Sequence, residues 1–409
     1  MIEKFDLAII GGGPAGLMAA GRASELGTKV VLLEKNNSLG IKLLMTGGGR
    51  CNFTNNSSIR NFTSSIGPNG SWLISGLNIF GPNDVIDFFQ SRGVEVGLED
   101  DNRVFPKSNK AHDILNALLA YVQEGGVKIL IDSKVDRVVK KDNLISKIIL
   151  SNGKEILADK FIFACGGKSY PNSGSSGEVF DWLKFLGHTI IDLKPALSQI
   201  FVKENVETIE GLSFSNIQIL AKNENFKSSK SRGGLIFTKK GLSGPAVLNL
   251  SRELTGKNKN LEIVLDFFPD KNKEELKIEI KNILNNNKNF NIKNTLALLV
   301  TKRLSDFLLD KIAIDKNRKS ASLSGSEVEN VVNILKSTHF TFIKVGDFSE
   351  AMISCGGVSL KEVDNKTMAS KIISNLYLAG ETLDLDGPTG GYNLQIAWTT
   401  GYLAGSSCF

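Results

Sequence analysis

The feature that most limits how this chain can fold is a strand, a glycine turn and a helix start within residues 5–20, FDLAIIGGGPAGLMAA. Leu7 to Ile10 are apolar, and Gly11, Gly13 and Gly16 follow with the spacing G-x-G-x-x-G. The first glycine permits a tight turn, the second leaves room for a pyrophosphate, and the third lets the helix pack closely on its strand. The pattern predicts a nucleotide-binding turn whose helix N-terminus faces the phosphates.

The second strand of such a site normally ends in an acidic residue. Lys29 to Leu33 read as that strand, and Glu34 follows Gly11 at close to the expected separation of about 20 residues. A carboxylate at this place suits an adenosine ribose with free hydroxyls and repels a 2′-phosphate. The N-terminal region therefore predicts an adenine dinucleotide, and both NAD and FAD satisfy the pattern.

Two further glycine-rich segments favour FAD. In KLLMTGGGRCNFTN, residues 42–55, Thr46 to Arg50 form a glycine-supported loop with few side chains to obstruct a flat ring, and such backbone loops bind anionic groups. In KFIFACGGKSYPNSGSSG, residues 160–177, a strand from Phe161 to Ala164 ends at Gly166 and Gly167. This segment is typical of the return strand of a nucleotide-binding domain.

The C-terminal region, residues 376–405, has the pattern of the other half of the same site. Leu376 to Ala379 form a short apolar strand that ends at Gly380 and Glu381. A polar turn with Asp384, Asp386 and Gly387 follows, and Gly390, Gly391, Tyr392 and Asn393 open a helix that continues through Gln395, Ala397 and Trp398. We expect this order to place a carboxylate beside ribityl hydroxyls and a helix N-terminus beside the pyrimidine edge of an isoalloxazine.

Seven motifs occur in order along the chain: GGGPAGLMAA, TGGGRCNFTN, RVFPKSNKA, GGKSYPNSGSSG, GLSGPAVLNLS, ISCGGVSLKEVDNKTMASK and LAGETLDLDGPTGGYNLQIAWTTGYLAG. From end to end they resemble the BaiN-like, aminoacetone-oxidase-like FAD-dependent oxidoreductases, also called HI0933-like flavoproteins. The resemblance implies an α/β fold: a Rossmann-like FAD-binding domain of the glutathione-reductase and fumarate-reductase type, an inserted β-barrel domain and a small helical cap. Asn102 stands where the family more often has glycine.

The motifs and the resemblance together define the expected site. The residues expected to bind FAD are Gly11, Gly13, Pro14, Ala15, Gly16, Glu34, Lys35, Lys42, Thr46, Gly47, Gly48, Gly49, Arg50, Cys51, Asn52, Val135, Ala164, Gly166, Gly167, Gly380, Glu381, Asp386, Gly387, Gly390, Gly391, Tyr392 and Asn393. Arg50, Arg103 and Tyr170 lie on motif loops and are the candidates for polarising or orienting a substrate. For Arg103 and Lys107 a structural salt bridge with Glu99, Asp100 or Asp101 is at least as good an explanation.

The order of the motifs predicts a discontinuous domain. Residues 1–193 and 346–409 should close into one FAD-binding domain, because the nucleotide site needs both. Alternating strands at Ser213–Leu220 and Leu261–Phe267 predict a barrel from residues 194–270 and 319–345. Helical apolar spacing at Lys273–Leu284 and Thr295–Asp310 predicts a cap from residues 271–318.

Length and charge fit a multidomain enzyme without marking a partner. The 409 residues are 41% apolar, and 49 basic against 43 acidic residues give a net charge of +6. Much of the excess lies in the Lys- and Asn-rich stretches 221–232 and 257–294, which lack interleaved aromatic residues, so we interpret them as solvated surface and expect no nucleic-acid partner. The first strand begins close to Met1 without a signal peptide, and the apolar runs are too short to span a membrane; we expect a cytoplasmic protein.

Cysteine and histidine chemistry is not indicated. Cys51, Cys165, Cys355 and Cys408 are widely spaced, so Cys51 has no partner for a dithiol relay and reads as a packed residue. His112, His188 and His339 are isolated and lack ligand spacing, and we expect no metal site.

The chain has no second dinucleotide fingerprint, because GLSGPA at 241–246 has glycines three apart and reads as the start of a helix. Reducing equivalents would then come from a transiently bound NAD(P)H, from the substrate itself or from a protein donor. We expect hydride transfer between FAD and a small organic substrate, an amine or a conjugated ketone by resemblance. A flavin-dependent nucleic-acid-modifying protein and a non-enzymatic redox sensor or electron-transfer module remain as alternatives; the sequence leaves the direction of the reaction and the oligomeric state open.

Overall fold

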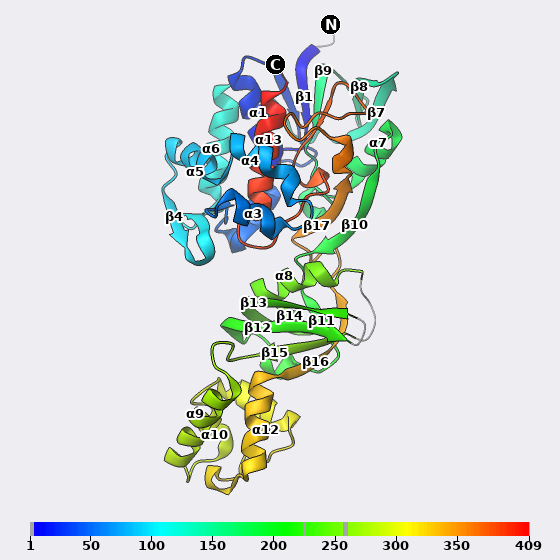
Figure 1. The fold of residues 1–409 in the computed structure, drawn as a ribbon. Helices are drawn as coiled ribbons and strands as arrows, with labels where there is room; N and C mark the ends of the chain where they lie inside the picture. Colours follow the sequence, from blue (N-terminus) through cyan, green and yellow to red (C-terminus); the bar gives the residue numbers. More distant parts are fainter. Residues whose placement is uncertain (1–3, 224–225, 257–260, 409) are drawn as a thin grey trace. The chain divides into compact units, whose positions relative to one another are not determined.

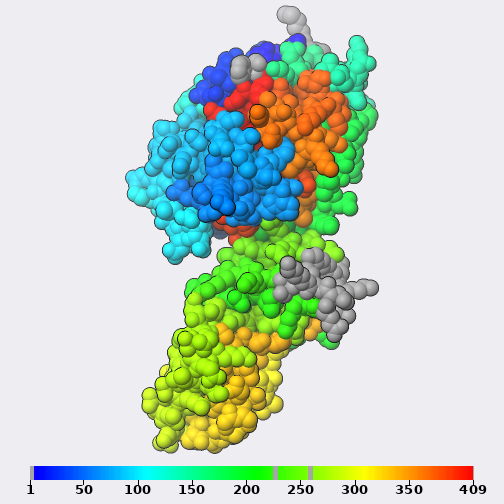
Figure 2. Space-filling model, in the orientation of Figure 1, coloured from blue at the N-terminus to red at the C-terminus, as the bar shows by residue number. Residues whose placement is uncertain are grey.

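The structure, a computed structural model, describes residues 4–223, 226–256 and 261–408, and it divides into two compact units. The first unit comprises residues 1–195 and 348–409, and the second comprises residues 196–347. Figure 1 shows the elements of both units, and Figure 2 shows the same view with all atoms. The first unit carries both chain ends, so the two halves of the predicted nucleotide site lie in one body.

A seven-stranded sheet forms the centre of the first unit. Its order is β6-β2-β1-β9-β8-β7, and β18 also pairs with β9. The strands are β1 (Lys4–Ile10), β2 (Val30–Leu33), β6 (Lys128–Leu130), β7 (Val135–Lys141), β8 (Leu144–Leu150), β9 (Glu155–Phe163) and β18 (Leu376–Leu378). The pairs β1–β2, β2–β6, β1–β9 and β9–β18 are parallel, whereas β7, β8 and β9 form an antiparallel meander. This arrangement confirms the predicted Rossmann-like fold.

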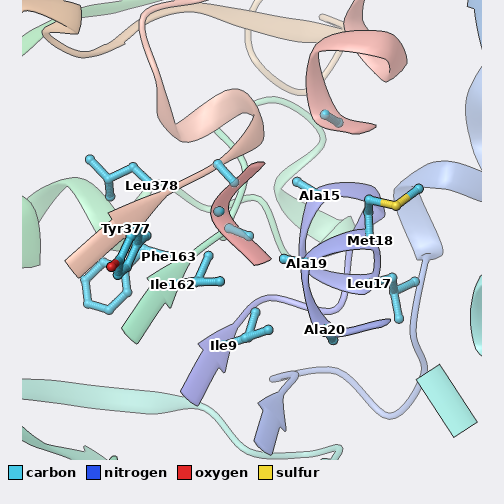
Figure 3. Close-up of a cluster of buried hydrophobic side chains, with 14 of the residues drawn as sticks. Ile9, Ala15, Leu17, Met18, Ala19, Ala20, Ile162, Phe163, Tyr377 and Leu378 are labelled. Atoms are coloured by element: carbon cyan, nitrogen blue, oxygen red, sulfur yellow. The ribbon is translucent and has the colours of Figure 1, made fainter. Parts of the chain in front are cut away.

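Helices cover the sheet and bury its apolar faces. They are α1 (Pro14–Glu25), α2 (Ile41–Met45), α3 (Ile59–Ile66), α4 (Ile74–Ile79), α5 (Pro82–Ser91), α6 (Ala111–Glu124), α7 (Glu178–Leu186) and α13 (Tyr392–Ser406). Figure 3 shows side chains of α1 together with side chains of β1, β9 and β18 in one buried cluster. Leu7, Ile9, Leu17 and Phe163 are fully buried there.

Two small sheets complete the first unit. One has the order β3-β5-β4, from Thr54–Asn55, Arg103–Pro106 and Val96–Glu99, and carries the predicted Arg103. The other pairs β10 (Ile190–Ala196) with β17 (Ile353–Val358). No helix in the part of the chain that the structure describes is both long and apolar enough to cross a membrane.

The second unit contains a closed six-stranded barrel of order β11-β14-β13-β12-β15-β16. Its strands are β11 (Ile200–Val202), β12 (Ser213–Asn223), β13 (Phe226–Thr238), β14 (Gly241–Ser243), β15 (Glu262–Asp266) and β16 (Thr338–Val345). Alternation produces its core, because Ile217, Ile219 and Ala221 of β12 are fully buried between more exposed neighbours. Helix α8 (Pro245–Leu254) packs on β12 and β13.

Four helices form the cap: α9 (Lys273–Asn286), α10 (Ile292–Leu296), α11 (Lys302–Lys311) and α12 (Gly325–Lys336). The prediction of one helix over Thr295–Asp310 is wrong, because residues 297–300 form a turn and Thr301 starts a new helix. The Thr301 side chain caps α11 by accepting a hydrogen bond from the Leu304 N–H. Helix α12 lies in the segment assigned to the barrel from the sequence and packs against α9.

Candidate flavin site

The glycines after β1 hold the first turn in three different ways. A Cβ on Gly11, whose φ is 108°, would lie 2.4 Å from the Ala164 carbonyl oxygen, and one on Gly16 would lie 1.9 Å from the Gly11 oxygen. Gly13 differs, because a Cβ there would meet no atom within 4 Å. The first and third glycines are therefore required by protein packing, while the second faces open space in front of α1, where a pyrophosphate would fit.

Close packing of α1 against α13 brings the two chain ends together. A Cβ on Gly401 would lie 2.4 Å from the Ala15 oxygen, and one on Gly405 would lie 2.5 Å from the Ala19 oxygen. Only glycine in α13 lets the helix backbones approach this closely. The four-residue spacing of Gly401 and Gly405 is the sequence signal that could have predicted this helix contact.

The Glu34 carboxylate lies beside the phosphate turn, at the end of β2. It is 8% exposed; Oε2 accepts from the Gly12 N–H at 2.8 Å, and Oε1 accepts from the Asn36 N–H at 2.9 Å and the Asn36 Nδ2 at 2.8 Å. Each carboxylate oxygen can accept more than one bond, so capacity remains for ribose hydroxyls. Asn36, which the sequence analysis did not include, fixes the rotamer of this carboxylate.

Three side chains and one backbone N–H form a network that connects four distant segments near the glycine turn. The Lys42 ammonium donates to Glu381 Oε2 and to Ser169 Oγ, both at 2.7 Å. Glu381 Oε1 accepts from the Ser354 N–H at 2.7 Å and from Ser169 Oγ at 3.0 Å. Both carboxylate oxygens of the predicted Glu381 thus accept hydrogen bonds from protein groups. Ser169 and Ser354 position this carboxylate, and no motif spacing had indicated them.

Gly166 and Gly167 pack against this region. Gly166 has a φ of 76°, and a Cβ on Gly167 would lie 2.7 Å from both Glu381 Oε1 and Ser354 Oγ. Ala164 continues the strand pairing, because its N–H donates to the Ile10 oxygen at 2.9 Å. These residues extend the pairing of β1 with β9 to the end of both strands, which agrees with the predicted return strand.

The glycine loop after α2 is a tight backbone turn that presents open space. Thr46–Gly49 form a 3₁₀ turn in which Gly47, Gly48 and Gly49 have φ values of 57°, 67° and 88°. Added Cβ atoms on Gly48 and Gly49 would meet no atom within 4 Å. The two glycines are therefore not required by neighbouring atoms, which leaves their backbone accessible to a flat ring.

Arg50 and Arg103 meet at one carboxylate. Arg50 Nη2 pairs with Glu99 Oε1, Arg50 Nε donates to Asn109 Oδ1 at 2.7 Å, and the guanidinium lies 4.2 Å from the centre of the Phe105 ring. Arg103 lies 3.7 Å from the other Glu99 oxygen. The hydrogen bond from Arg50 lowers the pKa of Glu99. The structural salt bridge considered for Arg103 is present, and Lys107 instead pairs with Glu95 at 3.4 Å.

Three predicted residues use their side chains inside the protein. Cys51 is fully buried, and burial raises the pKa of its thiol to about 12, so the thiol is an inert packing group. Asn52 Oδ1 accepts from the Val104 N–H at 3.2 Å, and Val135 is 4% exposed in the core. The Cys51 thiol has no accessible surface, so it contributes packing within the protein.

The C-terminal turn is held by the helix that follows it. Asn393 Oδ1 accepts from the Gly387 N–H at 2.8 Å, and Asn393 Nδ2 donates to the Gly387 and Pro388 oxygens at 2.9 and 3.2 Å. Gly391, with a φ of 96°, precedes α13, and a Cβ there would lie 2.2 Å from the Thr54 oxygen. The first i→i−4 bond runs from the Gln395 N–H to the Gly391 oxygen, so three N–H groups before it open toward the turn.

Most of the remaining predicted residues contact other parts of the protein around the site. Pro14 is the first residue of α1, Ala15 packs under Gly401, and Gly380 donates its N–H to Thr400 Oγ1 at 2.9 Å. The Tyr392 ring lies 4.7 Å from the Phe62 ring. Lys35 donates to Ser176 Oγ at 2.6 Å and pairs with Glu178 at 3.2 Å; Asp386 and Gly390 lie in the half-exposed part of the turn.

Tyr170 follows the Ser169 network with a left-handed backbone, at a φ of 51°. Its N–H donates to the Phe348 oxygen at 3.0 Å, and its side chain is half-buried. A non-glycine residue with positive φ is unusual and points to constraint by its surroundings. Asn102 is another, with a φ of 58°, a conformation that glycine adopts without strain.

Metal chemistry finds no support among the described residues, where no group of three His, Cys, Asp or Glu side chains could hold an ion. His188 instead bonds to Glu362 at 3.2 Å and to Ser370 Oγ at 2.9 Å. Burial lowers the pKa of His188. This histidine is a satisfied core residue.

Comparison with known proteins identifies the family. Residues 5–407 match the family described as "HI0933-like protein Rossmann domain". The chain belongs to that family. The membership and the dinucleotide-binding fold confirm the prediction of an FAD-dependent oxidoreductase, because the glycine turn, the Glu34 carboxylate and the open space at Gly13 fit this cofactor.

Two relatives are similar to this chain over nearly its full length, and one solved structure shares its fold. The chain is 30% identical over 407 residues to the 3-dehydro-bile acid delta(4,6)-reductase of Clostridium scindens, covering 98% of each chain. It is 29% identical over 404 residues to the ribosomal RNA dihydrouridine synthase of Haemophilus influenzae, again covering 98% of each. A 3-ketosteroid-delta4-(5alpha)-dehydrogenase from Rhodococcus jostii shares the fold, with a TM-score of 0.55, 14% identity and coverage of 99% of this chain and 96% of that one.

One relative supports the partners expected from the sequence, and the other opposes one of them. A small-molecule substrate agrees with the bile-acid reductase. The expectation that nucleic acid is not a partner is opposed by the relative that is named for ribosomal RNA. That expectation interpreted the Lys- and Asn-rich stretches as solvated surface without interleaved aromatic residues, whereas the stretch 257–294 contains Phe290, which is exposed.

Proposed function

We propose that this protein reduces a carbon–carbon double bond that is conjugated to a carbonyl group. The observation that carries the proposal is Arg50, which Glu99, Asn109 and Phe105 hold at the end of the open glycine loop. Charge develops on the carbonyl oxygen when a hydride adds to the conjugated carbon, and a fixed cation stabilises that charge. Reduced FAD supplies the hydride when it is bound.

The names of the two relatives support this reaction class. A 3-dehydro-bile acid with delta-4 and delta-6 double bonds is a conjugated ketone, and dihydrouridine is uridine whose 5,6 double bond, conjugated to a carbonyl, has been reduced. Both names describe the same change of bonds on different molecules. Between the amine and conjugated-ketone classes that the family resemblance implied, the relatives therefore favour the conjugated carbonyl.

The chain offers separate groups for the other tasks. Arg50 and Arg103 would orient the carbonyl oxygen, and Tyr170 would deliver the proton that completes reduction at the second carbon. The Lys42–Glu381–Ser169 network would keep the loop after β9 against the flavin segment. Residues of the two chain ends would hold the cofactor: the Gly11–Gly16 turn and Glu34 its adenosine diphosphate, and the Gly387–Asn393 turn its ring.

Reduced nicotinamide would bind only transiently. The GLSGPA segment is β14 followed by α8. Close packing requires its glycines, because an added Cβ would lie 2.1 Å from the Ile200 oxygen at Gly241 and 2.8 Å from the Gly234 oxygen at Gly244. We expect slow reduction by NADH and NADPH, with little preference between them. Submicromolar affinity for either in a titration would contradict this.

Two substrate classes are open to the same chemistry. A small conjugated ketone is the first, by resemblance to the bile-acid reductase. A uracil base in RNA is the second, and the distribution of charge favours it: residues 196–347 hold 24 basic and 17 acidic residues, against 25 and 26 in the rest of the chain. The whole positive excess belongs to the inserted unit.

An anaerobic reoxidation experiment tests the proposal. The holoprotein is reduced with dithionite before a 4-ene-3-ketosteroid or a uridine-rich RNA is added, an amine is added to a parallel sample of the oxidised holoprotein, and the flavin spectrum is followed in both. We expect reoxidation by one of the first two, with two hydrogens gained by the substrate in mass spectrometry. Reduction of the oxidised flavin by the amine, with no reaction of either conjugated carbonyl, would overturn it.

Substitution of the arginine separates binding from chemistry. Arg50→Lys keeps the charge but loses the planar fork that reaches Glu99 and Asn109, so we expect kcat per bound FAD to fall by about 10²-fold. Arg60→Lys, at an exposed position on α3, is the matched control and should leave kcat unchanged.

A further inference from the structure

The loop between α9 and α10 presents an aromatic side chain to solvent. Phe290 is 55% exposed, in the sequence N-N-N-K-N-F-N-I-K-N of residues 285–294. The two helices that flank it are labelled in Figure 1. Exposed single apolar residues are ordinary on protein surfaces, so the exposure alone carries no function. Its setting does.

The backbone under Phe290 is braced by a second segment. The Phe290 oxygen accepts from the Ser320 N–H at 2.9 Å and from Ser320 Oγ at 3.2 Å, and the Ile292 N–H donates to the Arg318 oxygen at 2.9 Å. Ser320 is 3% exposed and also bonds to Thr295 Oγ1 at 2.7 Å. The ring is therefore presented on a fixed frame, so little conformational entropy is lost when a partner stacks on it.

Three lysines without a carboxylate partner lie near Phe290, two of them along the chain and one across the loop. Lys319 pairs across the loop with Asn291 and donates its ammonium to the Asn289 oxygen at 2.7 Å. Lys293 donates to Asn317 Oδ1 at 2.9 Å, and Lys288 is exposed. In the described part of the chain none of the three forms an ion pair with Asp or Glu, so their charges remain available to an anion.

We propose that this surface, Phe290 with Lys288, Lys293 and Lys319, binds single-stranded RNA. Phe290 would stack on a base and the lysines would contact the backbone phosphates, which is how proteins bind single strands without reading sequence. The proposal concerns binding by the inserted unit alone. It goes beyond the proposed reduction, because RNA can bind here whichever bond the flavin reduces.

The amide side chains favour RNA over an apolar partner. Six asparagines, at positions 285, 286, 287, 289, 291 and 294, lie within five residues of Phe290 in the chain. Their burial in a membrane or an apolar protein interface would be costly, whereas base edges and phosphates offer them hydrogen bonds. The net positive charge of the inserted unit acts in the same direction.

Fluorescence anisotropy of the full-length holoprotein tests this with a labelled oligouridylate of about 20 nucleotides. Phe290→Ala should raise Kd roughly 5- to 150-fold, the equivalent of one lost stack, and Phe290→Trp should restore affinity. Phe185→Ala is the matched control: this phenylalanine is 64% exposed on α7 of the FAD-binding unit, and we expect no change.

The salt dependence tests the lysines. The triple change of Lys288, Lys293 and Lys319 to Gln should lower the slope of log Kd against log salt by about 2, since each phosphate contact on a single strand contributes about 0.7. The same change at Lys110, Lys154 and Lys366, which are exposed in the FAD-binding unit, should leave the slope unaltered. An unchanged Kd in Phe290→Ala would overturn the proposal, as would Phe290-dependent binding to anionic phosphatidylserine vesicles without RNA binding.

Discussion

The FAD-binding unit and the inserted unit are stabilised by different contacts. In the FAD-binding unit, backbones touch where glycine is required: Gly16 on Gly11, Gly401 on Ala15 and Gly391 on Thr54. The barrel relies mainly on alternating side chains such as Ile217, Ile219 and Ile263, and any similar apolar residue would fill those positions. The first kind of contact fixes glycine at a given position, whereas the second fixes only an alternating apolar pattern.

The units also differ in charge. The FAD-binding unit is close to neutral, whereas the inserted unit has seven more basic than acidic residues. The expectation that nucleic acid is not a partner interpreted the basic stretches of the inserted unit as solvated surface without interleaved aromatic residues, although Phe290 lies within one of them. Charge is informative only when it is assigned to the body that carries it.

The largest effect should come from filling a backbone contact. Gly401→Val would place its Cβ 2.4 Å from the Ala15 oxygen, and two helix backbones cannot yield that space, so we expect a loss of well over 3 kcal/mol and no soluble protein. Gly325→Val is the control, since nothing lies within 4 Å of a Cβ at that helix start in the inserted unit. Soluble, yellow Gly401→Val protein would show that the α1–α13 contact is adaptable.

Next in size is the loss of the cofactor without loss of the fold. Gly13→Val adds atoms to the open space before α1, so the protein should fold with an unchanged circular dichroism spectrum yet purify colourless. Flavin absorbance after purification checks this. Full FAD occupancy would mean that the pyrophosphate does not lie against Gly13.

Among the described residues, each unit has a well-shielded pair of a lysine with a carboxylate, and breaking the two pairs separately should affect different properties. Lys42→Met leaves Glu381 unpaired, and Lys336→Met leaves Asp266 unpaired; each should cost about 2–3 kcal/mol. Only the first should weaken FAD retention. Lys4→Met, whose pair with Asp159 is exposed, should cost less than about 1 kcal/mol. Equal FAD loss in both buried variants would remove the distinction between the units.

The smallest effect concerns pH. Burial lowers the pKa of His188 below 6.5, so the unfolded chain binds the proton more readily than the folded one, and stability should decrease as pH falls below 6.5 toward that lowered value. His188→Gln should flatten this dependence of the melting temperature in the FAD-binding unit, while His112→Gln, at an exposed position, should not. A wild-type profile in His188→Gln would assign the acid sensitivity to other groups.

Local patterns predicted the elements around the cofactor well. The turn after Ile10 and the start of α13 at Tyr392 occur where the glycine spacing indicated, because a positive φ or a close backbone approach demands glycine whatever lies elsewhere. The cap was predicted less well. Apolar spacing continues through residues 297–300, and only the Thr301 cap shows that two helices are present.

Side-chain roles in the site needed the tertiary structure. The motif residue Asn393 holds the Gly387 turn, Glu381 holds Lys42 and Ser354, and Cys51 is sealed in the core. Each residue type is compatible with contact to a cofactor, and the partner that occupies it lies far away in the sequence. No spacing rule could reveal Ser354 as the partner of Glu381.

By itself, then, the sequence determined that two chain ends build one dinucleotide site, because backbone geometry at glycine is a local property with a strong steric signature. The tertiary structure decided which side chains are free to act there and which are committed to one another. It also decided that Phe290 stands exposed on a braced loop while the basic excess belongs to its unit. Exposure and pairing depend on long-range packing, which local residue patterns do not encode.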